Sequence, residues 1–101
     1  MAARVVRLFP EAEDEVQLQE LWYSRRSERA AQAFLLELDH ALERIAVAAE
    51  AYPLYRRGTR RFVMHRFPYS VVYRIEGSVI YVVAVANAKR RPEYWRGRKI
   101  P

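Results

Sequence analysis

The sequence predicts an α+β fold with a short N-terminal strand, an antiparallel pair of helices and three C-terminal strands. Two apolar patterns and their order along the chain lead to this prediction. The strongest apolar stripe with helical spacing lies in the first half of the chain, between residues 27 and 45. Runs with strand character lie in the second half, between residues 62 and 86. Because the helices precede strands that tight turns join, the helix pair should cover one face of a mainly antiparallel sheet.

The first elements are a strand over Arg4–Phe9 and a helix that begins at Pro10. Proline suits the first turn of a helix, because the backbone N–H that it lacks has no helical partner there. The following residues are acidic, which the positive end of the helix dipole favours. These acids are Glu11, Glu13, Asp14 and Glu15. We therefore expect a helix from Pro10 to about Tyr23, with most of its carboxylates on a solvated face.

Ser27 is the expected N-cap of the second helix, since its hydroxyl can accept a free N–H of the first turn. The apolar residues that follow at three- and four-residue spacing are Ala31, Phe34, Leu35, Leu38, Ala41, Leu42 and Ile45. Only residues 24–26 separate the two helices, which predicts a hairpin. The predicted core contacts join Phe34, Leu38, Leu42 and Ile45 to Tyr73, Val83 and Val85.

Three strands are expected after the exit loop at Tyr52–Gly58. The first covers Phe62–Phe67 and stops at Pro68, and the second alternates from Tyr69 to Ile75. Glu76-Gly77 is a turn signal. The last strand, Val79–Ala86, is apolar at both odd and even positions, which is typical of a strand that is buried on both faces or central in its sheet.

Composition limits the classes of protein that the chain can represent. Its 101 residues amount to a single domain, residues 1–101. Apolar residues make up 51% and charged residues 30%, which excludes an intrinsically disordered chain. The absence of cysteine excludes disulfide scaffolds, thiolate zinc sites and cysteine nucleophiles. We expect a cytoplasmic protein with no cofactor, and no membrane segment, because no apolar run is long enough to span a bilayer. We expect no metal, because His40 and His65 lack the spacing of a metal site.

The two halves of the chain carry opposite charge. Residues 1–55 hold six arginines and ten acids, whereas residues 56–101 hold twelve basic residues and only two acids, Glu76 and Glu93. The second half therefore has a net charge of +10, and its arginines are interleaved with aromatic residues. Such a half attracts nucleic acid, an acidic protein segment or another anionic surface.

Three local sequences resemble the RelE/ParE superfamily of toxins from bacterial type II toxin–antitoxin systems. The first is the strand-to-helix opening Phe9–Glu13. The second is Arg66–Arg74, with a phenylalanine-proline-tyrosine entry into a strand. The third is the ending, Ala84–Asn87 followed by Arg90–Arg98. The resemblance covers essentially the whole chain and implies the fold derived above.

The resemblance implies one of two activities on this fold. RelE-like members cut ribosome-bound mRNA, and ParE-like members poison DNA gyrase. A ribonuclease of this type would use basic groups, for which the candidates here are Arg61, His65, Arg90 and Tyr94. Ser70 stands where ribonuclease members carry a phosphate-holding arginine, and Asn87 stands where ParE-like members often carry a histidine. Ser70 therefore argues against a ribonuclease, and Asn87 cannot transfer a proton near neutral pH. The arginine-proline-x-tyrosine-tryptophan ending is nevertheless more similar to the ParE branch, and we expect a non-enzymatic, ParE-like toxin.

The ParE-like interpretation implies two partners, DNA gyrase and a cognate antitoxin, and a hetero-oligomer with the latter. The candidate target-binding residues are Lys89, Arg90, Arg91, Tyr94, Trp95 and Arg96. The candidate antitoxin-binding residues are Arg66 and Arg74. The alternatives are a RelE-like toxin that acts on the ribosome and mRNA, a plain basic nucleic-acid-binding module, and a degenerate toxin that only binds its antitoxin. Tyr94 and Trp95 can also be read as residues that cover a sheet edge.

Overall fold

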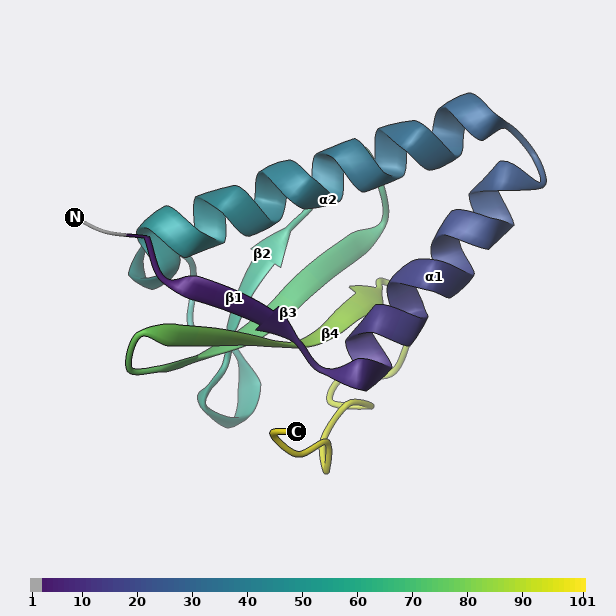
Figure 1. The fold of residues 1–101 in the computed structure, drawn as a ribbon. Helices are drawn as coiled ribbons and strands as arrows, with labels where there is room; N and C mark the ends of the chain where they lie inside the picture. Colours follow the sequence, from purple (N-terminus) through teal and green to yellow (C-terminus); the bar gives the residue numbers. More distant parts are fainter. Residues whose placement is uncertain (1–2) are drawn as a thin grey trace.

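The computed structural model describes residues 3–101 and has the expected order of elements (Figure 1). The helices and strands are β1 (Val5–Leu8), α1 (Pro10–Ser24), α2 (Glu28–Ala48), β2 (Arg60–Val63), β3 (Tyr69–Glu76) and β4 (Val79–Asn87). The strands form one sheet in the order β1-β4-β3-β2, in which β1 is parallel to β4 and the other pairs are antiparallel. The predicted α+β class is confirmed.

Both helices begin where the sequence predicts. The N–H of Ala30 donates to Ser27 Oγ at 3.2 Å, so Ser27 is the N-cap of α2. Pro10 occupies the first turn of α1, and Phe9 before it provides no side-chain cap. The two helices form a hairpin whose axes diverge away from the connection (Figure 1). Helix α1 therefore reaches the β4 side of the sheet, where it can contact the segment that follows β4.

The central strand β4 lies between β1 and β3, as its apolar character predicts. Its register against β3 steps from Val72–Ala84 to Tyr73–Val82, so Val83 is an extra residue in β4. This arrangement is a β-bulge, which bends the strand and changes which backbone groups face its neighbours. The bulge determines how the last part of the chain is attached to the sheet.

The expected strand over Phe62–Phe67 is wrong beyond Val63. Residues 65–68 form a bend instead of continuing β2. The carboxylate of Glu37 on α2 accepts the backbone N–H groups of His65 and Arg66, each at 3.1 Å. These donors are therefore taken by a helix side chain, and no strand ladder can use them. The alternating sequence pattern does not reveal such a long-range competitor.

The main part of the core lies between α2 and the sheet, and it contains three of the four α2 residues predicted to make its contacts. Phe34, Leu38 and Ile45 are buried, as are the predicted sheet partners Tyr73, Val83 and Val85. Leu42 is only half-buried at the margin of this core. The hydroxyl of Tyr73 donates to the carbonyl of Ala49 at 2.6 Å, and burial raises the pKa of Tyr73 to about 12. No helix in residues 3–101 has the length and apolar character needed to cross a membrane.

Two neighbouring leucines on α2 give a matched test of this core. Leu38 is 4% exposed, whereas Leu36 is 58% exposed. Leu38→Ala should lower the free energy of unfolding by about 2–5 kcal/mol, because the cavity it leaves cannot fully close. Leu36→Ala should change stability by less than about 0.5 kcal/mol. Urea unfolding followed by circular dichroism measures both, and equal midpoints for the two variants would contradict the assigned helix face.

Candidate functional site

The candidate site is a cleft on the sheet face that lies away from the helices. Successive residues of a strand point to opposite faces. Phe62 and Val71 belong to the helix-side core, so Arg61 and Ser70 next to them face the other way. The C-terminal segment, residues 88–101, lies on the opposite side of the sheet from α2 (Figure 1). A cleft of about 170 Å³ is lined by both parts of the chain, including Tyr55, Arg61, Ser70, Asn87, Arg90, Arg91, Tyr94 and Trp95.

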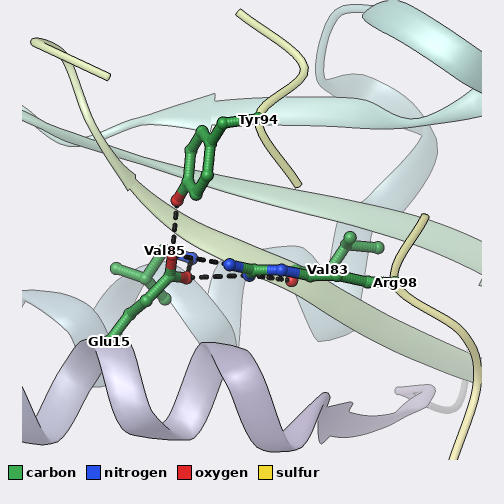
Figure 2. Close-up of polar contacts among 5 residues, drawn as sticks. All are labelled: Glu15, Val83, Val85, Tyr94 and Arg98. Atoms are coloured by element: carbon green, nitrogen blue, oxygen red, sulfur yellow. Dashed lines mark hydrogen bonds and ion pairs between the residues drawn. The ribbon is translucent and has the colours of Figure 1, made fainter. Parts of the chain in front are cut away.

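A single carboxylate on α1 anchors the C-terminal segment (Figure 2). The guanidinium of Arg98 donates to both oxygens of Glu15, each at 3.1 Å. The hydroxyl of Tyr94 donates to Glu15 Oε2 at 2.5 Å, and the N–H of Val85 donates to Glu15 Oε1 at 3.0 Å. The side chains of Glu15 and Arg98 are only 14% and 16% exposed. This charge-assisted bidentate pair therefore fixes the segment with little competition from water.

The bulge at Val83 supplies the backbone part of this anchor. Strand β1 ends at Leu8, opposite Val82, and leaves the rest of that edge of β4 without a strand neighbour. Arg98 Nη1 donates to the carbonyl of Val83 at 2.9 Å, and the N–H of Val85 is bound by Glu15. Side chains from α1 and from the C-terminal segment thus satisfy backbone groups that a longer β1 would otherwise pair.

Tyr94 is held inward by this anchor. Burial raises the pKa of the Tyr94 hydroxyl well above its ordinary value, and its hydrogen bond to Glu15 raises the pKa further. The guanidinium carbon of Arg90 lies 3.9 Å from the centroid of the Tyr94 ring. The hydroxyl therefore stays protonated and engaged with Glu15, while the outer face of the ring supports a cation.

Trp95 differs from the surface contact expected of it. Its side chain is 4% exposed and belongs to the hydrophobic core. The Trp95 ring lies 6.3 Å from the ring of Tyr55, centroid to centroid, on the sheet face that faces away from α2. This burial favours the interpretation of Trp95 as a residue that covers the sheet. Trp95 therefore stabilises the fold in addition to any contact that it makes with a target.

A second attachment joins the C-terminal segment to the loop before β2. Arg57 Nε and Arg56 Nη1 donate to the carboxylate of Glu93 at 2.5 Å and 3.1 Å. These bonds, the one from Arg57 foremost, hold the pKa of Glu93 below its ordinary value. Arg57 and Glu93 both have left-handed backbone conformations, with φ of 58° and 62°. A residue other than glycine adopts such a conformation only at a cost in free energy. The ion pairs between the two segments therefore hold both backbones in one particular conformation.

Three arginines at the cleft remain free to bind an anion. Within residues 3–101, no carboxylate forms an ion pair with Arg61, Arg90 or Arg91. Arg61 lies over the ring of Tyr55 at 4.4 Å, which holds its guanidinium in place. Lys89 and Arg96 are exposed on the same segment. The face therefore carries a concentrated positive charge on rigidly attached backbone.

The four ribonuclease candidates do not come together. Arg61, Arg90 and Tyr94 line the cleft, but His65 lines a different cleft against α2. Ser70 and Asn87 lie in the first cleft, so both departures from the family pattern fall at the site itself. Among residues 3–101, no group of three or more acidic, histidine or cysteine side chains could hold a metal ion.

The two antitoxin-binding candidates lie near opposite ends of β3. Arg66 precedes the first residue of the strand and lines the cleft against α2. Arg74 lies two residues before the end of β3 and donates to Glu76 at 3.2 Å. The structure therefore does not bring the two arginines into one contact surface.

Sequence reasoning missed Glu15, the residue that organises the site. In the sequence, Glu15 is one of four acids at the start of α1, and the helix dipole and a solvated face are enough to explain all four. Its spacing contains a usable signal, because Glu15 lies three residues after the buried Ala12 and four before Gln19. Gln19 in turn accepts a hydrogen bond from the hydroxyl of Tyr69. The inward face of α1 thus carries polar side chains that bond to the sheet and to the C-terminal segment.

The anchor can be tested with two glutamates of α1. Glu15→Gln should lower the free energy of unfolding by about 2 kcal/mol, because Arg98 loses its counter-ion in a mostly buried position. Glu13→Gln, at an exposed position, should cost only a few tenths of a kcal/mol. Under native conditions, trypsin should also cut the Lys89–Lys99 region faster in the first variant. Parent-like cleavage and stability of Glu15→Gln would contradict the anchoring role.

Comparison with known proteins identifies the family. The model of the ParE toxin of type II toxin–antitoxin systems, parDE, matches residues 6–92. A solved structure described as the chromosomal ParDE TA system from P. aeruginosa has a TM-score of 0.74 and 15% sequence identity, over 84% of this chain and 96% of that chain. At this identity the likeness shows a shared fold. No curated protein matches the sequence. Because the family match spans most of its length, the chain belongs to the ParE toxins of type II toxin–antitoxin systems.

Proposed function

We propose that this chain arrests growth by inhibiting DNA gyrase and that it does not cut RNA. The observation that carries the proposal is the separation of the possible proton-transfer groups. His65 lies against α2, whereas Arg61, Arg90 and Tyr94 lie across the sheet. Cleavage of RNA at a ribose hydroxyl needs a base and an acid that both reach the same phosphate. Because the sheet lies between His65 and the other three residues, they cannot reach the same phosphate.

The individual groups in the cleft support the same proposal. The hydroxyl of Tyr94 is bound to Glu15 and has a raised pKa, which makes it a poor proton donor or acceptor near neutral pH. Ser70 and Asn87 have no acid–base function in that range. The cations that remain can bind phosphate or carboxylate but do not move a proton.

The face is better suited to binding than to catalysis. Lys89, Arg90, Arg91 and Arg96 are exposed on a segment that Glu15 and Glu93 attach to the domain. Preorganised cations of this kind increase the rate of association with an acidic protein surface or with DNA. A complex of gyrase with DNA offers both kinds of surface. Since gyrase acts on DNA in the cytoplasm, the toxin would act there too.

Membership of a parDE family implies an antitoxin partner. We propose that the two proteins form a stable hetero-oligomer in which the antitoxin neutralises the toxin. Arg66 and Arg74 are the exposed or half-exposed basic residues proposed to contact it. Their separation along β3 means that one antitoxin chain would have to extend over the sheet to reach both.

Supercoiling and RNA-cleavage assays on purified toxin separate the two activities. The parent should inhibit gyrase supercoiling, and Arg90→Gln/Arg91→Gln should weaken inhibition about tenfold or more, because two unpaired cations are lost from the binding face. Arg29→Gln, an exposed arginine at the start of α2, should inhibit as the parent does. Primer extension on translating ribosomes should show no new RNA ends.

The contrary result is equally definite. Codon-specific cuts by the parent, with supercoiling untouched, would replace the gyrase proposal with a RelE-like activity. In that case Arg61, Arg90 and Tyr94 would have to act on RNA without His65. The supercoiling assay needs no antitoxin, so it leaves the toxin–antitoxin contact to a separate test.

A further inference from the structure

A second basic cleft lies on the helix side of the sheet. It has a volume of about 230 Å³ and lies between α2 and the connection from β2 to β3. Its basic side chains are His40 and Arg44 from α2, and His65 and Arg66 from the connection. The buried residues Ala41 and Phe62 form its apolar part. None of these groups takes part in the target-binding face.

Glu37 holds the two walls of this cleft together. Its carboxylate Oε2 accepts the N–H of His65 and the N–H of Arg66, each at 3.1 Å. The bonds fix the connection against α2, so that the side chains of His65 and Arg66 stand beside those of the helix. Glu37 is the one carboxylate among the residues that line this cleft, and its Oε2 atom is already occupied by these two N–H groups.

The basic side chains of the cleft are available to a ligand. His40 and Arg44 are four residues apart and therefore share one face of α2. All four basic side chains are exposed, and within residues 3–101 neither Arg44 nor Arg66 forms an ion pair. Two permanent cations and two imidazoles thus face a single carboxylate that backbone donors already hold. The cleft is electrostatically prepared for an anion.

We propose that this cleft binds an acidic side chain, aspartate or glutamate, of the antitoxin. The inference rests on the family membership, which supplies a protein partner, and on charge complementarity. Because that partner is a protein, the anionic groups it can place in the cleft are the carboxylates of its aspartate and glutamate side chains. The apolar residues Ala41 and Phe62 suit the aliphatic part of the same side chain or an apolar neighbour.

The position of the cleft separates this contact from the target-binding face. Phe62 and Arg61 are adjacent in β2 and point to opposite faces of the sheet. A carboxylate bound beside Phe62 therefore leaves the cleft at Arg61 uncovered. Variants of the helix-side cleft should accordingly change the affinity for antitoxin without changing the inhibition of gyrase.

Affinity measurements with the antitoxin encoded beside the toxin gene test the proposal. Arg44→Gln and Arg66→Gln should each weaken the binding of antitoxin about five- to tenfold. Each substitution removes one guanidinium group that would pair with the carboxylate of the antitoxin. Arg7→Gln is the matched control, since Arg7 is exposed on β1 at the opposite edge of the sheet. It should bind as the parent does. Melting curves of all variants verify that they are folded.

The histidines provide a second readout that is independent of affinity. The chain has only two, and both line this cleft, so their imidazole NMR signals report on it alone. Both signals should move when antitoxin is added, and acetate, the probe of a single carboxylate, should move them in the same direction. Unmoved signals, or parent-like affinity of both arginine variants, would overturn the proposal. The gyrase proposal would be unaffected, because supercoiling is assayed without antitoxin.

Discussion

The attachment of the C-terminal segment depends on the carboxylate of Glu15. This one side chain joins three parts of the chain, because it accepts hydrogen bonds from Val85 in β4 and from Tyr94 and Arg98 beyond it. Without it, the segment that carries the exposed cations would be tethered mainly by Glu93 and by the burial of Trp95. The site is therefore a property of α1 as much as of the segment itself.

Most of the architecture follows from patterns within short stretches of sequence. The Ser27 cap, the apolar face of α2 and the fully apolar β4 are local signals, and each appears in the structure as expected. The missing part of the predicted strand after Val63 has a cause 28 residues away, the carboxylate of Glu37. Leu42 lies at the margin of the core instead of inside it. Helical spacing identifies which face of a helix is buried, but it does not give the width of that face.

The candidate site was less predictable for the same reason. Sequence reasoning found the basic residues but not which face of the sheet each would occupy. The bulge at Val83 and the bend at residues 65–68 decide that, and neither has a clear signature in one sequence. The opposite charges of the two chain halves indicate an anion-binding face, but they do not indicate which acids hold that face in place. Glu15 and Glu37, both in the acidic half, each position residues of the basic half.

The parallel pairing of β1 with β4 bears on the order in which the chain can fold. Val5 pairs with Val79, and Glu15 meets Arg98, so the sheet and the anchor each need residues more than 70 positions apart. During synthesis the helix hairpin can form early, but the anchor can form only after Arg98 has been added. Contacts of such long range slow folding. A newly made chain therefore passes through an interval in which its helix hairpin can be present while its C-terminal segment is not yet attached to the sheet.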